Sequence, residues 1–451
     1  MGLFDDGVVA DLGYSWRSDK AKFFPNGPDS YRYPQWLEPT INQTVADSHW
    51  PILSVELEDI RRCVAAFEEL EEPKLKSIVD GIGNLEKLYF HHFSSWLEHH
   101  EPDWVFAINL TLPHAVSATS ALYMAADLYY KNHPGGLLIW DHDLCGSNGR
   151  WDAEVNRRFY PTVPNNLTPL PPEAPHIKWI VVSQALAREA ETYETTVRPQ
   201  VVANVLPTVP SGIEPHHRDF ARQFDLAPGR PILLNPVRIY RVKGVSQALR
   251  FHAEVVDKCS RRLLPPPYLL IFGSLDEDPD YADELIALRD ELSIEEYVRF
   301  LGGVPLETMR EDNGDWRLDE VDLLRLARAT NGGVVFTPCV NDFETVGLGP
   351  GLAGAAEIPA VSTRYNAYDE VYGAQAFACT TFAPDGTGMT EAAAKFVDVL
   401  SNFARRDGTL IAELKRNRMV VESLFPAAPW RTLLGSMNGN IDSPAASRRC
   451  E

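Results

Sequence analysis

The feature that most constrains the fold of this chain is a repeated alternation of short apolar runs with longer amphipathic segments. The apolar runs of the first half are WVFAINL, GGLLIW, KWIVVS and PQVVANVL, and those of the second half are PILLNPV, YLLIFG, YVRFLG, GVVFTP and PAVS. Continuous apolar strands between amphipathic helices are typical of parallel sheets that are covered on both faces. The pattern therefore predicts an α/β fold with two doubly wound domains.

The boundary between the two series is expected in the segment PTVPSGIEPHHRDF, which has Pro, Gly, His and charge without periodicity. We predict an N-terminal domain over residues 1–212 and a C-terminal domain over residues 213–424. In residues 425–451 we expect a helix that returns to the N-terminal domain and then a polar, frayed tail. Two such domains in series place a cleft between the carboxyl ends of both sheets. Residues 1–55 have no clear periodicity and receive no elements.

Charge and cysteine content narrow the class of partner. The formal net charge of −21 argues against nucleic acid or an anionic membrane surface, since either partner needs a basic face. The six cysteines are scattered without a C-x-x-C pair, which favours a reducing compartment. Because neither a signal peptide nor an apolar run of membrane-spanning length is seen, we expect a cytoplasmic chain without a transmembrane segment.

Two cations follow the first strand of the second series. Arg238 and Lys243 lie five residues apart in NPVRIYRVKG, and the chain continues through Gly244 into a helix. By spacing alone the simpler interpretation is a solvated loop with two surface cations. The helix start adds N-terminal amides beside them, and this combination suits a diphosphate.

A second anchor is the carboxylate in DFETVGLGPGLAGAAEIPAVS. Glu344 precedes a Gly-rich run that is expected to be a buried helix feeding the next strand. Such a residue is often only a helix cap. Small residues also let a ligand approach the backbone closely, so Glu344 is a candidate acceptor for sugar hydroxyls, with the amides of Thr345, Val346 and Gly347 facing the ligand.

Taken together, these motifs resemble the retaining GT-B glycosyltransferases of the group-1, GT4-like type. In that family an Arg and a Lys five residues later bind the donor diphosphate, as Arg238 and Lys243 would. A strand ending in Pro, a Glu, a Gly three residues later and a Pro before the next strand also match, at VVFTP, Glu344, Gly347 and Pro359. The segment VPSGIE is similar to the interdomain linker motif of the family.

The resemblance implies further site residues in both domains. FLGGVP is similar to the loop that lines the nucleotide base, so the resemblance assigns Gly303 and Val304 to donor binding. It assigns Leu348, the neighbour of Gly347, to donor binding as well. IWDHDL is similar to the strand end that carries a His beside the donor sugar, here His142. The implied catalytic set is Glu344, His142, Arg238 and Lys243.

The implied activity is transfer of a hexose from a nucleotide sugar, with UDP- or GDP-sugar as the expected donor, to a small-molecule or glycan acceptor. The resemblance implies no cofactor and no metal ion. We interpret the pairs His91–His92, His99–His100 and His216–His217 as solvated helix histidines, because no carboxylate is obviously poised beside them.

Three departures from the family pattern keep alternatives open. The second Glu of the pattern, which holds the ribose hydroxyls, falls on Leu352, the Gly-Gly loop of the first strand is not seen in residues 1–55, and PCVNDFE has two extra residues before Glu344. A non-catalytic nucleotide- or sugar-binding homologue is therefore the second hypothesis. A different GT-B enzyme, such as a phosphorylase or a nucleotide-sugar epimerase, is the third.

Overall fold

The computed structural model of the 451-residue chain describes residues 8–11, 36–40, 59–112, 116–146, 151–152, 157–158, 160–339 and 344–441. Internal contacts divide the chain into two compact units. The first unit contains the described residues up to Asn204 and those from Ala427 onward, and the second contains Val205–Pro426. The sequence analysis placed the domain boundaries after residues 212 and 424, and the contacts place them after residues 204 and 426. Most of residues 1–55, the region in which the family pattern has its Gly-Gly loop, lie outside the described residues.

The first unit is built on a four-stranded parallel sheet in the order β3-β4-β7-β8. These strands span Trp104–Ile108, Gly136–Asp141, Ile177–Val181 and Gln200–Val201. Each coincides with one of the apolar runs of the first half. A separate parallel pair joins β1 (Val8–Asp11) to β2 (Leu37–Thr40), and an antiparallel pair joins β5 (Trp151–Asp152) to β6 (Arg157–Arg158).

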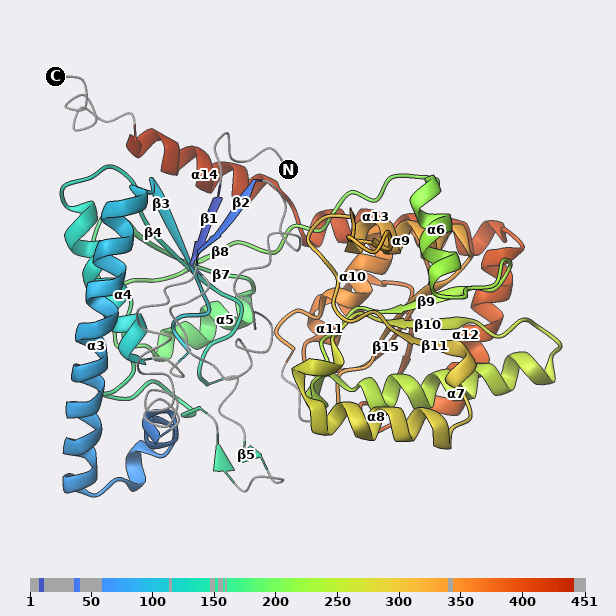
Figure 1. Cartoon of the computed structure of the whole chain (residues 1–451), viewed down its shortest axis with the longest axis horizontal. Coiled ribbons are helices and arrows are strands. Elements are labelled where there is room, and N and C mark those ends of the chain that lie inside the picture. The colour runs from blue at the N-terminus through green and yellow to red at the C-terminus, as the bar shows by residue number, and fades with distance from the viewer. Residues whose placement is uncertain are drawn as a thin grey trace. The chain divides into compact units, whose positions relative to one another are not determined.

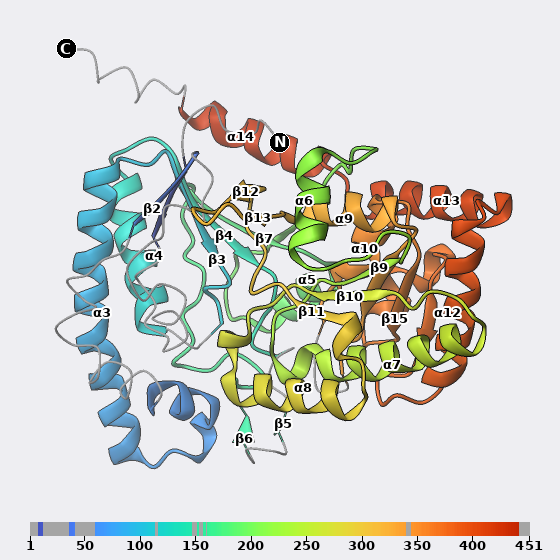
Figure 2. The same cartoon turned by 45° about the vertical axis from the view of Figure 1, so that its right-hand side comes forward.

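Two long helices pack together beside the sheet of the first unit. Figure 1 shows α3 (Glu72–His100) next to α4 (Val116–Tyr130), and Figure 2 shows the same pairing. The helix α3 begins at Glu72 with Pro73 in its first turn, where proline is favoured. Its apolar stripe includes Ile78, Leu85 and Phe93, which are buried.

The last helix belongs to the first unit. It is α14 (Ala428–Ile441), and Trp430 Nε1 donates a hydrogen bond to the carbonyl oxygen of Ala203 at 2.9 Å. The Trp430 ring also contacts Trp140 of β4, with ring centroids 4.8 Å apart at 70°. A buried indole whose N–H has a partner is a stable anchor, so this contact fixes the helix on the sheet.

The second unit has a six-stranded parallel sheet in the order β11-β10-β9-β14-β15-β16. Its strands are β9 (Ile232–Asn235), β10 (Tyr268–Ile271), β11 (Val298–Phe300), β14 (Gly333–Phe336), β15 (Ala360–Thr363) and β16 (Thr380–Phe382). From β9 the chain proceeds outward to β11, then crosses back to β14 and proceeds the other way. The strand order therefore reverses between β9 and β14. Open α/β sheets bind ligands beside the carboxyl ends of the strands at such a reversal.

Helices cover both faces of this sheet, as expected for a doubly wound domain. Figures 1 and 2 show α7 (Val245–Arg261) and α8 (Pro279–Glu291) on one face, with α9 (Glu320–Ala329), α10 (Leu348–Ala355) and α13 (Gly408–Leu424) on the other. The helix α12 (Met389–Ala404) packs beside α7. The remaining elements include α5 (Gln184–Glu189), α6 (Pro215–Gln223), α11 (Tyr368–Val371) and a hairpin of β12 (Met309–Arg310) and β13 (Trp316–Arg317). The predicted α/β class with two Rossmann-like domains is confirmed.

Candidate functional site

The candidate site lies where the strand order of the second unit reverses. Lys243 follows β9 and Glu344 follows β14, and these two strands are neighbours in the sheet. The Lys243 Nζ lies 2.5 Å from Glu344 Oε1, and the two side chains are 29% and 16% exposed. The structure thus brings together two predicted site residues that are 101 positions apart.

The loop that carries Lys243 is fixed by a close approach of two backbones. Gly244 has φ 65°, in the left-handed region, and a Cβ atom there would lie 1.8 Å from the carbonyl oxygen of Thr337. The Thr337 hydroxyl in turn donates a hydrogen bond to the carbonyl oxygen of Gly244 at 3.0 Å. Only glycine fits this position, and the contact holds the loop after β9 against the loop after β14.

The turn that carries Glu344 is held by hydrogen bonds from two buried tyrosines. The Tyr365 hydroxyl donates to the carbonyl oxygen of Val346 at 2.8 Å, and the Tyr372 hydroxyl donates to that of Gly347 at 2.7 Å. Gly347 has φ 71° and is the N-cap of α10, and a Cβ atom there would lie 2.1 Å from the Tyr365 hydroxyl oxygen. The sequence predicted a helix opening at Glu344, but α10 begins at Leu348, so Thr345, Val346 and Gly347 form a tight turn before it.

The backbone of Glu344 is hydrogen-bonded to the side-chain amide of Asn366. Asn366 Oδ1 accepts a hydrogen bond from the Glu344 N–H at 3.2 Å, and Asn366 Nδ2 donates to the Glu344 carbonyl oxygen at 3.1 Å. This pair of bonds satisfies both backbone groups of one residue and sets the direction in which its side chain leaves the turn.

Arg238 has its own set of partners. Its Nε lies 3.4 Å from Glu277 Oε2, and its guanidinium stacks over the Tyr240 ring at 4.7 Å while donating to the Tyr240 hydroxyl at 2.9 Å. The Arg238 side chain is 56% exposed, so its charge faces solvent. Glu277 also accepts from the Ile239 N–H at 2.8 Å, which fixes the loop between Arg238 and Lys243.

The predicted base-lining residues lie on the loop after β11. Gly302 and Gly303 both have left-handed φ values, of 70° and 96°. The Gly303 N–H donates to the Phe272 carbonyl oxygen at 2.9 Å, and Arg317 donates to the carbonyl oxygens of Gly302 at 3.1 Å and Gly303 at 2.5 Å. Val304, next to them, is partly exposed.

His142 belongs to the first unit, where it directly follows β4. Its backbone N–H donates to Asn109 Oδ1 at 2.7 Å, and Asn109 itself has φ 56° at the end of β3. The imidazole packs against the Trp140 ring at 4.8 Å, and burial lowers the pKa of His142 below its usual value. The ring is therefore held neutral at physiological pH, as suits a hydrogen-bonding rather than a charged role.

Leu352 is 4% exposed on α10. Its helix, LGPGLAGA, carries no hydrogen-bonding side chain at all. The position where the resemblance placed a ribose-binding carboxylate is thus an apolar contact inside the unit.

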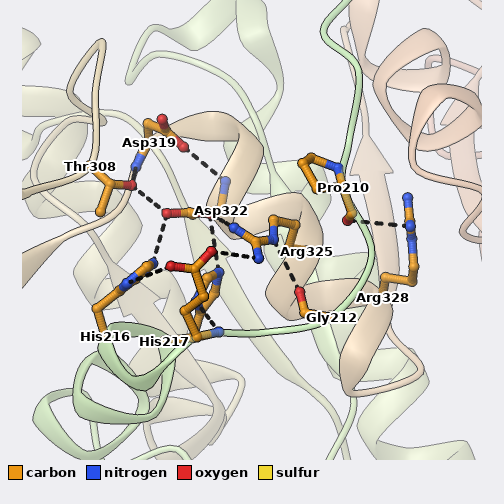
Figure 3. Close-up of polar contacts among 10 residues, drawn as sticks. Pro210, Gly212, His216, His217, Thr308, Asp319, Asp322, Arg325 and Arg328 are labelled. Atoms are coloured by element: carbon orange, nitrogen blue, oxygen red, sulfur yellow. Dashed lines mark hydrogen bonds and ion pairs between the residues drawn. The ribbon is translucent and has the colours of Figure 1, made fainter.

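A cluster that sequence reasoning did not find joins α6 to α9 (Figure 3). Asp322 accepts hydrogen bonds from His216 Nε2 at 2.9 Å, from the Thr308 hydroxyl at 2.7 Å and from Arg325 at 2.8 Å, and His217 Nε2 lies 3.2 Å from it. Burial alone would raise the pKa of Asp322, but these neighbours hold it below the usual value. The sequence interpretation of His216 and His217 as solvated is wrong for His217, which is fully buried.

The donor atoms of this cluster fit a hydrogen-bonded hub better than a metal centre. The evidence is the tautomer of His217. Its Nδ1 accepts a hydrogen bond from the Glu214 N–H at 3.1 Å, so its Nε2 carries the proton. A protonated nitrogen has no lone pair for a metal ion. The His216 and His217 rings also stack at 4.3 Å and 28°, which keeps their in-plane lone pairs from converging on one point.

The cluster also fixes the segment that follows the first unit. Arg325 donates to the Gly212 carbonyl oxygen at 3.0 Å and to Glu214 at 2.9 Å, and Arg328 reaches the Val209 carbonyl oxygen at 3.3 Å. Residues 209–214 are therefore bound to α9 of the second unit, as Figure 3 shows for Gly212.

Comparison with solved structures identifies the fold. A glycosyltransferase from Rickettsia africae matches with a TM-score of 0.51 and 11% identity, covering 98% of this chain and 100% of that one. HepE from Anabaena, in complex with UDP-glucose, matches with a TM-score of 0.51 and 15% identity over 78% of this chain and 81% of that one. The N-terminal domain of trehalose-6-phosphate phosphatase from Candida albicans matches with a TM-score of 0.54 and 11% identity over 95% and 89%.

The chain thus has the GT-B glycosyltransferase fold, at low sequence identity. No protein-family model matches the sequence, and no curated protein matches it either. Among the described residues, no helix is both long and apolar enough to cross a membrane.

Sequence reasoning missed Tyr365, Asn366 and Tyr372. They follow β15, the strand beside β14. The available signal was their position after an apolar strand, because the carboxyl ends of neighbouring parallel strands lie at the same sheet edge.

Proposed function

We propose that this chain is a retaining glycosyltransferase that moves a hexose from a nucleotide-sugar donor to a small or polar acceptor. The observation that carries the proposal is the contact of Lys243 with Glu344 at the strand-order reversal of the six-stranded sheet. A cation and a carboxylate at this edge match the two needs of such a donor, a diphosphate and a sugar. The complex of HepE with UDP-glucose supports a nucleotide sugar as the class of donor.

The proposed chemistry rests on charge that develops at the leaving group. As the bond from the anomeric carbon to the diphosphate breaks, negative charge grows on the phosphate oxygens. The Lys243 ammonium and the Arg238 guanidinium stabilise that charge, and α10 presents its positive N-terminal end beside the same turn. A fixed cation that interacts more strongly with the leaving diphosphate than with the intact donor lowers the barrier. These two side chains fill the role without a divalent metal ion.

Glu344 has a separate role in this proposal. Its carboxylate accepts hydrogen bonds from hydroxyls of the donor sugar and sets the anomeric carbon toward the acceptor. The leaving phosphate takes the acceptor proton, so departure and attack occur on the same sugar face and configuration is retained. His142, held neutral by burial, is proposed to bind the sugar or the acceptor. Gly303, Val304, Thr345, Val346, Gly347 and Leu348 are proposed as backbone contacts for the donor.

A non-catalytic nucleotide- or sugar-binding homologue is the second candidate. The observation that favours it is Leu352, an apolar side chain only 4% exposed that cannot accept a bond from a ribose hydroxyl. Such a protein would bind a nucleotide sugar and leave it intact.

The first test is binding of UDP and GDP by titration calorimetry. Lys243→Ala is expected to weaken binding by about 1.5–3 kcal/mol, the scale of a lost charge-assisted hydrogen bond. Lys415→Ala, which removes an exposed lysine from α13, is the matched control and is expected to leave affinity unchanged. Equal affinities for Lys243→Ala and the wild type would remove the phosphate assignment.

The second test is release of nucleoside diphosphate from a panel of UDP-, GDP-, ADP- and dTDP-sugars with mixed acceptors, with and without EDTA. Glu344→Gln keeps the shape of the side chain and removes its charge, so turnover is expected to fall by at least tenfold. Affinity for the free nucleoside diphosphate is expected to hold or tighten, because Lys243 loses a competing carboxylate. No turnover together with measurable sugar-nucleotide binding would favour the second candidate, and no binding of any donor would remove both.

A further inference from the structure

Among the described residues around the turn, Asn366 is the one whose side chain bonds both backbone groups of Glu344. Its Oδ1 accepts from the Glu344 N–H at 3.2 Å and its Nδ2 donates to the Glu344 carbonyl oxygen at 3.1 Å. An amide group with one acceptor and one donor matches the two backbone groups of a single residue. This two-point contact fixes rotation of the peptide planes on both sides of Glu344.

A second contact fixes the same turn two residues later. Tyr365, next to Asn366 in the sequence, is 3% exposed and donates its hydroxyl to the Val346 carbonyl oxygen at 2.8 Å. A Cβ atom at residue 347 would lie 2.1 Å from the Tyr365 hydroxyl oxygen, so only glycine fits there and the backbone of the turn packs directly against the tyrosine. The segment after β15 therefore forms the support on which the turn after β14 rests.

We infer that Asn366 is the residue that positions Glu344, with Tyr365 supporting the same turn; this inference rests on the proposed function. Glu344 acts on the donor only if its carboxylate leaves the backbone in one direction, and the Lys243 contact alone does not set that direction. The two Asn366 bonds do, because they hold the backbone from which the side chain departs. Positioning of a reacting group to within a fraction of an ångström is worth large rate factors.

Asn366 is well suited to a test because its side chain is exposed. Asn366→Ala removes both bonds, and Asn366→Asp keeps the acceptor for the Glu344 N–H but loses the donor. Asn402→Ala, at an exposed position on α12, is the matched control. Thermal unfolding of all three variants is expected to lie close to that of the wild type, since Asn366 and Asn402 are exposed and water can reach the Glu344 backbone groups that Asn366→Ala releases.

The first readout is hydrogen–deuterium exchange of the peptide that covers residues 344–348, which needs no ligand. Asn366→Ala is expected to speed exchange there by at least tenfold, and Asn366→Asp by less. The second readout is the affinity ratio between UDP-glucose and UDP, which isolates the contribution of the sugar. This ratio is expected to fall at least fivefold in Asn366→Ala while the affinity for UDP stays within twofold, and kcat is expected to fall more than KM rises.

Unchanged exchange at residues 344–348, or an unchanged affinity ratio in Asn366→Ala, would overturn the inference while leaving the proposed function standing. A wild-type chain that binds no nucleotide sugar would overturn both, and would be recognised because the control variant fails in the same way. Equal loss in Asn402→Ala would also overturn the inference, because the effect would then not be specific to the Glu344 turn.

Discussion

A buried carboxyl at the end of β4 makes the first unit sensitive to pH in a predictable way. Asp141 is fully buried, and its Oδ2 accepts a hydrogen bond from Trp179 Nε1 at 2.7 Å. Burial raises the pKa of Asp141 from 3.8 to about 7, even though the bond from Trp179 favours the ionised form. The folded chain therefore binds a proton at this site over a pH range in which the unfolded chain has lost it.

The sign of the effect follows from proton linkage. Between pH 4 and pH 7 the folded state holds more protons than the unfolded state, so this group lowers the free energy of unfolding as pH rises, and its effect is constant above about pH 8. The interval between 3.8 and 7 corresponds to about 4 kcal/mol at 1.36 kcal/mol per pH unit. Asp141→Asn removes the titration and keeps an oxygen for Trp179, but buries an amide N–H₂ at a cost of about 1–3 kcal/mol that does not depend on pH.

The measurement is urea unfolding of the wild type and Asp141→Asn from pH 4.5 to pH 8.5, followed by tryptophan fluorescence. Trp316 is the one tryptophan within residues 205–426, so the signal reports mainly on the first unit. The difference in stability, variant minus wild type, is expected to increase by about 3–4 kcal/mol across this range. Asp103→Asn, at an exposed position of the same unit, is the matched control. Parallel pH profiles for Asp141→Asn and the wild type would refute the reasoning.

Two further predictions concern the second unit. Arg325→Ala is expected to lower the free energy of unfolding by about 3 kcal/mol, because it removes the arginine from the buried Asp322 carboxylate, which keeps its bonds from His216 and Thr308. Arg222→Ala, with a side chain 79% exposed, is expected to change this free energy little, and equal effects of the two substitutions in thermal unfolding would contradict this. Gly244→Ala is expected to lower the free energy of unfolding by about 1–3 kcal/mol and to weaken UDP binding, because its Cβ atom would clash with the Thr337 carbonyl oxygen. A variant as stable as the wild type would show that the loop can move aside.

The fold was predictable because its signal is local. Every apolar run that the sequence analysis assigned contains a strand of the structure. A short apolar run between turns buries all of its side chains when it forms a strand in a sheet that is covered on both faces. The elements that were not assigned had weaker or overlooked local signals. β16 has three residues at a sheet edge, too short for a period to show, whereas α12 has a clear amphipathic pattern that could have been found. Pro73, in the first turn of α3, was a local signal for the start of that helix.

The candidate site was predictable only in part, because its contacts combine segments far apart in the chain. The juxtaposition of Lys243 and Glu344 follows from strand order, since both residues follow neighbouring parallel strands. The hold of Asn366 on Glu344 does not follow, because a loop asparagine has many local partners and the sequence does not say which one it takes. The buried state of His217 was missed because Asp322, which lies beside its Nε2, comes from α9, far along the chain.

Other contacts already hold the two loops that carry Lys243 and Glu344, and this bears on which function the site serves. The two loops are already joined by the hydrogen bond from Thr337 to Gly244, and the Glu344 turn is already held by Tyr365 and Asn366. An ion pair with side chains 29% and 16% exposed also loses hydration, so its net contribution to stability is small. A lysine and a glutamate that meet at the strand-order reversal, beside turns that other hydrogen bonds already hold, are better explained by a ligand that carries a negative charge for Lys243 and hydroxyl groups for Glu344.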